Sequence, residues 1–170
     1  MNNDYARILG ELGKIERSFN VRILYACESG SRAWGFASED SDWDVRFIYK
    51  RSREWYLSID VERKRDVIEQ PVTELLDISG WDLRKALWLF GKSNPPLIEW
   101  LHSPMVYSVG QEGLANRLRN LLPLYYSPRS CFHHYLHMAR GNFREYLRGE
   151  TVRTKKYLYV LRPLLALRWI

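Results

Sequence analysis

The chain has few of the features that mark secreted, membrane-spanning or disordered proteins. Only two of its 170 residues are cysteine, which excludes the disulfide framework of small secreted domains. No apolar run approaches the roughly 20 residues of a membrane span, and the N-terminus lacks the basic and apolar pattern of a signal peptide. Low-complexity tracts and internal repeats are also missing. We therefore expect a soluble, cytoplasmic globular protein without a membrane partner, in which Cys27 and Cys131 are buried and reduced.

Positive charge is concentrated toward the C-terminus. Residues 129–170 carry 9 basic and 2 acidic side chains, a formal charge of +7, whereas residues 1–128 sum to −1. A field of this sign attracts nucleotides and nucleic acids. A solvated basic helix face would give the same pattern, so charge alone does not separate the two interpretations.

Hydrophobic periodicity predicts strands in the first half of the chain and helices in the second. The expected strands are 21–27, 42–49, 66–69 and 74–79. The expected helices are 4–18, a short one near 31, 82–91, 96–102, 111–122, 129–148 and one from 154 that Pro163 kinks. This order predicts an α+β fold. We place an α+β lobe at 1–95 and a helical lobe at 96–170.

The stretch between the first two strands predicts chemistry. Alternation along a strand puts Asp42 and Asp44 on one face, where two carboxylates repel unless a cation lies between them. Mg²⁺ takes one or two carboxylates and also binds substrate phosphates. The Gly30-Ser31 turn can present backbone N–H groups to those phosphates. The combination indicates phosphoryl or nucleotidyl transfer.

These residues also carry a family resemblance. Gly30-Ser31 followed by Asp42-x-Asp44 resembles the signature of the polymerase-β-type nucleotidyltransferase superfamily. More narrowly, Gly-Ser-Arg-Ala-Trp-Gly-Phe with Ser-Asp-Trp-Asp-Val-Arg resembles the RNA-repair-associated family of predicted nucleotidyltransferases, the YcgL/RlaP-like family. Residues 77–87, 92–101 and 155–165 match the same pattern. Members of this family run longer, so the helical lobe is expected to be truncated at its C-terminus.

The resemblance implies a polymerase-β-like lobe, a small mixed sheet with flanking helices, followed by a helical lobe. It also implies an NTP substrate and Mg²⁺ or Mn²⁺, with attack of an acceptor hydroxyl on the α-phosphorus and release of pyrophosphate. Asp42 and Asp44 would be catalytic and bind metal, and Asp77 would complete the metal site as the general base. Glu69 and Glu74 are weaker alternatives for that third position, and a strand-end cap is the structural alternative for Asp77.

The resemblance also implies residues that bind the nucleotide. Gly30 and Ser31 match the phosphate-binding pair, and Arg32 can reach the triphosphate or lie exposed. Lys155 and Lys156 in the helical lobe are further candidates, unless they form a basic solvent face. Arg46 falls on the face of Asp44, where it can pair with that carboxylate.

The acceptor is less constrained by the sequence. An RNA end is favoured by the basic C-terminal part and by the family's association with RNA repair. Three arginines at i, i+4 spacing, Arg140, Arg144 and Arg148, can track a phosphate backbone or form a solvated stripe. A small-molecule or protein acceptor and a non-catalytic nucleotide- or RNA-binding module are the alternatives. His133 and His137 have zinc-pair spacing without a companion glutamate or cysteine, so they are interpreted as ordinary core or surface residues.

Overall fold

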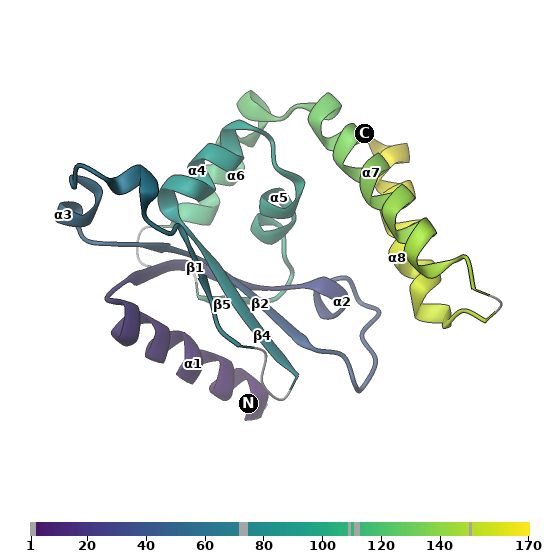
Figure 1. The fold of residues 1–170 in the computed structure, drawn as a ribbon, viewed down its shortest axis with the longest axis horizontal. Helices are drawn as coiled ribbons and strands as arrows, with labels where there is room; N and C mark the ends of the chain where they lie inside the picture. The colour runs from purple at the N-terminus through teal and green to yellow at the C-terminus, as the bar shows by residue number, and fades with distance from the viewer. Residues whose placement is uncertain (1–2, 72–74, 109, 111–112, 150) are drawn as a thin grey trace.

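The computed structural model describes residues 3–71, 75–108, 110, 113–149 and 151–170. Its centre is a five-stranded sheet in the order β3-β4-β2-β1-β5 (Figure 1). The strands are β1 (Arg22–Ser29), β2 (Trp43–Lys50), β3 (Val67–Glu69), β4 (Leu76–Asp82) and β5 (Val106–Ser108). β2 and β4 run parallel, whereas the other adjacent pairs run antiparallel. The sheet is therefore mixed, and the expected α+β class is confirmed.

Helices cover both faces of this sheet. The longer ones are α1 (Asn3–Phe19), α4 (Leu83–Gly91), α5 (Pro95–Leu101), α6 (Leu114–Tyr125), α7 (Pro128–Tyr146) and α8 (Thr154–Trp169). Two single-turn helices, α2 (Gly30–Ala33) and α3 (Arg53–Tyr56), and a 3-10 turn at Val61–Arg63 lie in the connections. Among the described residues, none of these helices is both long and apolar enough to cross a membrane.

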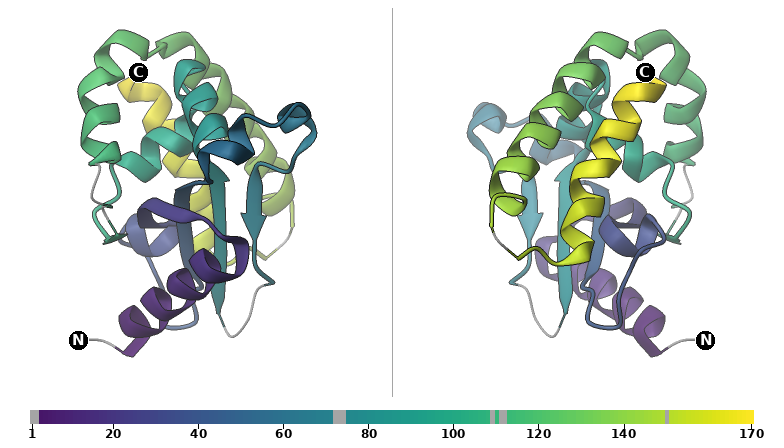
Figure 2. Two further views of the ribbon diagram at one scale, coloured as in Figure 1. Left: turned by 90° about the vertical axis from the view of Figure 1, so that its left-hand side faces the viewer. Right: turned by 90° about the vertical axis from the view of Figure 1, so that its right-hand side faces the viewer.

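Two hydrophobic cores follow from the alternation of the strands. On one face, Ile8 and Leu12 of α1 pack against Val45 and Phe47 of β2. On the other face, alternate strand residues such as Ile48 pack against α4, α5 and α6. Figure 2 shows α1 and these helices on opposite sides of the sheet. The two cysteines, Cys27 and Cys131, are buried and free, as expected.

The last two helices form an antiparallel pair that stands beside the rest of the molecule (Figures 1 and 2). α8 continues through Pro163 to Trp169, although a proline at this position removes a backbone donor from the helix. The carbonyl of Tyr159, four residues earlier, instead accepts a hydrogen bond of 2.8 Å from the Asn142 side chain of α7. The packing of α7 on α8 thus satisfies the carbonyl that the proline leaves free. Whether this region is a separate helical lobe beginning near residue 96 remains a prediction.

Most expected elements are found, with shifted ends. β4 extends to Asp82, beyond the expected strand end at residue 79, and the helix expected at 82–91 begins at Leu83. Asp82 is the N-cap of α4 and its side chain accepts a hydrogen bond from the backbone N–H of Arg84, so its expected role at the helix start is confirmed. The expected strand at 74–79 and helix at 111–122 begin at residues outside the described part of the chain. β5 was not expected.

Candidate active site

Two of the predicted carboxylates lie side by side on neighbouring strands. Asp44 of β2 is directly opposite Asp77 of the parallel strand β4. Their neighbours Val45 and Ile78 point into the core beneath α1, so alternation directs both aspartates to the opposite face of the sheet. Asp42, which directly precedes β2, is exposed. Strand pairing therefore joins residues 33 positions apart in the sequence.

A guanidinium group bridges these two carboxylates. Nη2 of Arg46 lies 2.7 Å from Oδ2 of Asp77 and 3.3 Å from Oδ1 of Asp44. Nη1 of Arg46 donates to the carbonyl oxygens of Val45 and Asp77. The expected pairing of Arg46 with Asp44 is present, and the stronger contact is with Asp77.

The surroundings of Asp44 raise the pKa of its carboxyl above the ordinary value. Burial raises the pKa of Asp44, Arg46 opposes this rise, and the nearby charges of Asp77 and Asp42 raise it further. Lys155 on α8 also acts to lower it. Clustered carboxylates with this mutual repulsion favour a bound cation.

Gly30 is fitted closely against Asp44. Gly30 has a φ of 73°, and a Cβ atom at this residue would lie 2.1 Å from Oδ2 of Asp44. Only glycine allows both the left-handed backbone and this approach. Ser31, the other half of the predicted phosphate-binding pair, is buried in the next position. The turn therefore lies directly against the carboxylate of Asp44.

Sequence reasoning missed the buried carboxylate of Glu28. One oxygen of Glu28 accepts a hydrogen bond of 2.8 Å from the backbone N–H of Asp44, and the other accepts one of 2.6 Å from the hydroxyl of Tyr107. Burial raises the pKa of Glu28, and these hydrogen bonds partly offset that rise. Glu28 thus ties the end of β1 to the start of β2. A glutamate at the end of an apolar strand, directly before the Gly-Ser turn, was the available signal.

Arg32 is engaged by the protein itself. Its guanidinium donates to the carbonyl oxygens of Ser41 and Asp42, at 2.6 and 3.2 Å, and lies 4.0 Å from the centre of the Trp43 ring. These contacts fasten α2 to the segment that begins β2. Its predicted contact with a triphosphate remains a prediction.

The two candidate lysines of α8 lie in different surroundings. Nζ of Lys155 donates to the hydroxyls of Ser41 and Ser38, at 2.7 and 3.1 Å, beside the aspartates. Nζ of Lys156 lies 3.9 Å from the centre of the Tyr146 ring on α7. The fold therefore brings Lys155 to the carboxylate site and places Lys156 against an aromatic ring.

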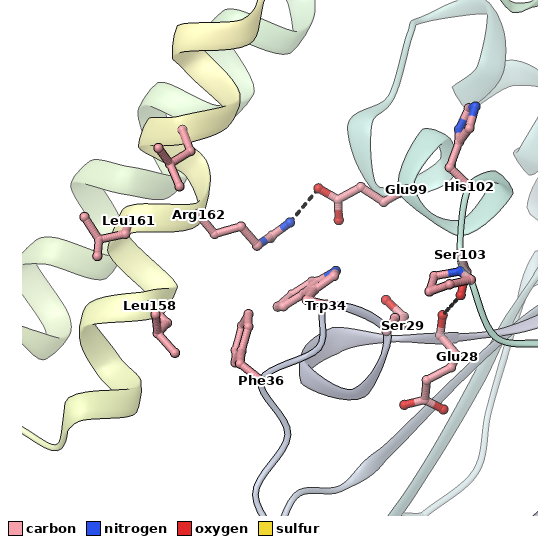
Figure 3. Close-up of a pocket in the computed structure, with 13 residues that line it drawn as sticks. Glu28, Ser29, Trp34, Phe36, Glu99, His102, Ser103, Leu158, Leu161 and Arg162 are labelled. Carbon is pink, nitrogen blue, oxygen red and sulfur yellow. Dashed lines mark hydrogen bonds and ion pairs between the residues drawn. The ribbon is translucent and has the colours of Figure 1, made fainter.

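A cavity of about 540 Å³ lies beside the Gly-Ser turn (Figure 3). One side is formed by Trp34 and Phe36, which follow α2, and the opposite side by Leu158, Leu161 and Arg162 of α8. Another side is lined by Glu99, His102 and Ser103. Glu28 and Ser29 lie at the end of the cavity. Arg162 pairs with Glu99 at 2.7 Å, and its guanidinium lies 3.7 Å from the centre of the Trp34 ring. The cavity is mostly apolar, with a few polar groups around it.

The basic stripe of α7 lies elsewhere. Arg140, Arg144 and Arg148 are exposed and line a shallow groove of about 320 Å³ together with Phe143 and Leu164, among others. A ring nitrogen of His137 lies 2.7 Å from the carbonyl oxygen of His133, which is a contact within the helix.

The donor chemistry of the site fits a hard divalent cation. Asp42 and Asp44 offer carboxylate oxygens next to a turn without side-chain bulk, and one or two carboxylates is the number that Mg²⁺ takes from a protein. Within the part of the chain that the structure describes, no group of three His, Cys, Asp or Glu side chains is arranged to hold a metal ion. Asp77 is paired with Arg46 in this structure, so its predicted role as third ligand and base remains a prediction.

Comparison with known proteins identifies the family of this chain. The sequence profile of the RNA repair pathway DNA polymerase beta family matches residues 5–170. An uncharacterized protein, YcgL of Bacillus subtilis (strain 168), is 57% identical over 164 residues, which are 96% of this chain and 62% of the relative. The chain thus spans about three fifths of the length of this curated relative. No solved structure matches the chain significantly. With the profile covering the glycine-serine turn, the aspartates and α8 alike, the chain belongs to the RNA repair pathway DNA polymerase beta family.

Proposed function

We propose that this protein is a metal-dependent nucleotidyltransferase that moves an NMP from an NTP to a hydroxyl acceptor and releases pyrophosphate. The observation that carries the proposal is the fit of Gly30 against Asp44, where a Cβ atom would lie 2.1 Å from the carboxylate oxygen. A phosphate-binding turn and a cation-binding carboxylate must lie this close if both are to act on one triphosphate.

Each residue has a role that its position supports. Asp42 and Asp44 would hold Mg²⁺ or Mn²⁺, which when bound neutralises charge on the phosphates and lowers the pKa of a coordinated hydroxyl. Gly30 and Ser31 would present backbone N–H groups to the phosphates. Asp77 would accept the proton of the acceptor hydroxyl, which requires that its contact with Arg46 be loosened in the complex.

Lys155 is the described cation of α8 best placed to reach a triphosphate. It already lies beside the aspartates through its hydrogen bonds to Ser38 and Ser41. A phosphate oxygen offers a stronger, charge-assisted acceptor than a serine hydroxyl. We propose that Lys155 exchanges the two hydroxyls for the triphosphate when the nucleotide binds.

The favoured acceptor is an RNA end. Support comes from the RNA repair pathway named for the family and from the exposed stripe of Arg140, Arg144 and Arg148. If the stripe contacts RNA, replacing the three arginines with glutamine would lower the slope of log affinity against log salt by about two, at roughly 0.7 per single-strand contact. An unchanged slope would leave a solvated helix face and favour small-molecule or protein acceptors.

The decisive experiment measures pyrophosphate release. The purified protein is incubated with Mg²⁺ or Mn²⁺, each of the four NTPs in turn, and RNA oligomers with 3′- and 5′-hydroxyl ends. Transfer of radiolabel from the α-phosphate of one NTP to the RNA, together with pyrophosphate and dependence on Asp44, supports the proposal. Incubation of the active protein with an oligomer whose ends are blocked is the control.

A non-catalytic nucleotide- or RNA-binding module is the second candidate. The ion pair between Arg46 and Asp77 favours it, because it engages the third carboxylate that a transferase would use. Metal-dependent NTP binding without pyrophosphate release, with every acceptor offered, would favour this module over the transferase.

A further inference from the structure

The cavity between α2 and α8 has no part in the chemistry proposed above. Its volume of about 540 Å³ lies in the range of small-molecule sites. Aromatic rings of Trp34 and Phe36, 5.6 Å apart, form one side, and aliphatic side chains of Leu158 and Leu161 form the other (Figure 3). Such walls suit a flat, apolar-faced ligand.

The polar groups around the cavity offer a hydrogen-bond acceptor. One oxygen of Glu99 accepts from Arg162 at 2.7 Å and from the hydroxyl of Tyr135 at 2.8 Å. No described residue forms a hydrogen bond with the other oxygen, which lies on the side of Trp34 (Figure 3). A carboxylate oxygen at the edge of an aromatic-walled cavity would recognise an N–H donor on a flat ring.

Arg162 holds this arrangement in place and is itself incompletely satisfied. Its guanidinium contacts the Trp34 ring and pairs with Glu99. Its Nε atom is buried and has no hydrogen-bond partner within the described part of the chain. A buried donor without a partner costs free energy. Because this Nε atom is shielded from the cavity, the polar group available to a ligand is the second carboxylate oxygen of Glu99.

The position of the cavity connects it to the phosphate turn. Ser29 and Ala33, both lining residues, flank the Gly30-Ser31 pair directly in the sequence. A molecule with phosphates at that turn would have its remaining part within reach of the cavity. The positive charge of residues 129–170 favours an anionic ligand of this kind.

We propose that this cavity binds a nucleobase that carries an exocyclic amino group, with its faces against the aromatic wall and its amino edge toward Glu99. The proposal rests on the proposed function, because that function supplies two sources of such a base: the NTP itself and the terminal nucleotide of an RNA acceptor. The other occupant of an apolar cavity, a peptide segment, would show no dependence on the amino group.

The first experiment tests the cavity without the phosphate site. Binding of guanosine, adenosine, cytidine and uridine to the purified protein is measured by saturation-transfer NMR titration with no divalent metal present. Trp34→Ala would weaken binding at least ~5-fold, the lower end of the range for a base stacked on an aromatic side chain. The matched control is Trp88→Ala, since Trp88 lies on α4, is 64% exposed and does not line the cavity.

A second variant, Leu161→Trp, tests the cavity in case Trp34→Ala does not fold. Leu161→Trp adds bulk at the rim from a residue that is 48% exposed, so the fold has room for it. It would narrow the cavity and reduce nucleoside binding while thermal unfolding stays near that of the unmodified protein. Nucleoside binding that survives in both variants, or that is absent from the unmodified protein, would overturn the proposal.

Recognition of the amino edge is tested separately. Uridine, which lacks an exocyclic amino group, should bind about tenfold more weakly than the other nucleosides, the scale of one hydrogen bond to a charged group. Glu99→Gln would remove most of this preference, because the amide is a weaker acceptor. Glu62→Gln is the control, as Glu62 also pairs with an arginine but lies on an exposed turn. Equal discrimination in Glu99→Gln and the unmodified protein would refute edge recognition.

Two further binding measurements show whether the bound base belongs to the NTP or to the RNA acceptor. If the base belongs to the NTP, ribose triphosphate without a base would bind more weakly than the NTP, and Trp34→Ala would remove the difference. If the base belongs to the acceptor, an RNA oligomer with an abasic end would bind more weakly than the intact oligomer, and Trp34→Ala would remove that difference. Nucleoside binding without any pyrophosphate release would support the cavity and refute the transferase. Transfer activity without nucleoside binding would support the transferase and refute the nucleobase site in the cavity.

Discussion

The guanidinium of Arg46 lies 2.7 Å from the carboxylate of Asp77, across two parallel strands. The same group reaches Asp44 at 3.3 Å, so a single positive charge reduces the repulsion between two neighbouring carboxylates. The protein therefore holds an internal cation beside Asp44 and Asp77, two of the carboxylates that we propose act in catalysis.

Replacing this cation should make stability depend on metal. Arg46→Gln would lose about 1–3 kcal/mol of the free energy of unfolding, because two half-buried carboxylates lose a charged partner. Added Mg²⁺ should then raise the melting temperature of the variant more than that of the unmodified protein. Arg84→Gln is the control, since Arg84 forms an exposed pair with Glu62. An equal response to Mg²⁺ in both variants would contradict this role for Arg46.

The aspartates beside the turn should be essential for turnover. Asp42→Asn and Asp44→Asn would each reduce pyrophosphate release at least ~10²-fold, the scale for removing one preorganised electrostatic partner. Circular dichroism spectra should stay unchanged, because neither side chain belongs to the two cores. Near-normal turnover in either purified variant would refute the assignment.

The space at Gly30 can be tested against a matched glycine. Gly30→Ala places a Cβ atom against Asp44, whereas Gly35→Ala, at a similar φ of 78°, meets no atom within 4 Å. Both variants should lose about 1 kcal/mol of stability from backbone strain, and Gly30→Ala should lose more because the Asp44 side chain must move away from the new Cβ atom. Only Gly30→Ala should also lose NTP binding and turnover, measured by calorimetry and pyrophosphate release. Similar losses in the two variants would show that the approach to Asp44 is unimportant.

Lys155 and Lys156 of α8 should differ in their effects: Lys155 on NTP binding and Lys156 on stability. Lys155→Ala would weaken NTP binding about tenfold, because a charge-assisted hydrogen bond to phosphate is lost. Lys156→Ala would leave NTP binding nearly unchanged and cost about 0.5–1 kcal/mol of stability through its lost contact with Tyr146. Titration with each NTP and thermal unfolding measure the two effects. A larger binding loss in Lys156→Ala would mean that α8 turns in the complex.

Asp82 should make stability depend on pH. Burial raises the pKa of this N-cap carboxyl above its ordinary value of 3.8, so the folded state holds the proton more tightly than the unfolded state. The resulting stabilisation is present below pH 3.8 and is lost as the pH rises through the folded-state pKa. Asp82→Asn keeps a capping oxygen and does not titrate. In urea unfolding between pH 3.5 and pH 7, the free energy of unfolding of the variant should increase relative to that of the unmodified protein as the pH rises. A difference in the free energy of unfolding that does not change with pH would contradict the raised pKa of Asp82.

Much of the site could be predicted because its parts are local. Alternation predicted the face of Asp44, and the glycine-serine turn directly follows β1, in the connection that leads to β2. Asp42 lies just before β2, so alternation along the strand does not fix its face. The contact of Arg46 with Asp77 could not be predicted, because it depends on the parallel pairing of β2 with β4, which no local pattern encodes. β5 has only three residues, too few for a periodic signal.

Other features required the packing of helices. Lys155 and Lys156 are adjacent in the sequence, but successive helical residues point about 100° apart, so only the placement of α8 distinguishes them. Glu28 was missed because a strand glutamate is usually solvent-exposed, whereas here Tyr107 of β5 and the backbone of Asp44 enclose it. Both cases depend on segments far away in the chain.

The parallel register of β2 and β4 makes the site sensitive to slippage in a way that its surface loops are not. A shift of one residue would bring Leu76 or Ile78 beside Asp44 and turn the carboxylate of Asp77 toward the apolar core under α1. An insertion between residues 76 and 78 would therefore destroy the site even if every functional residue were retained. An insertion in the polar segment 57–65 would leave the register intact, so variation in length among relatives should collect there.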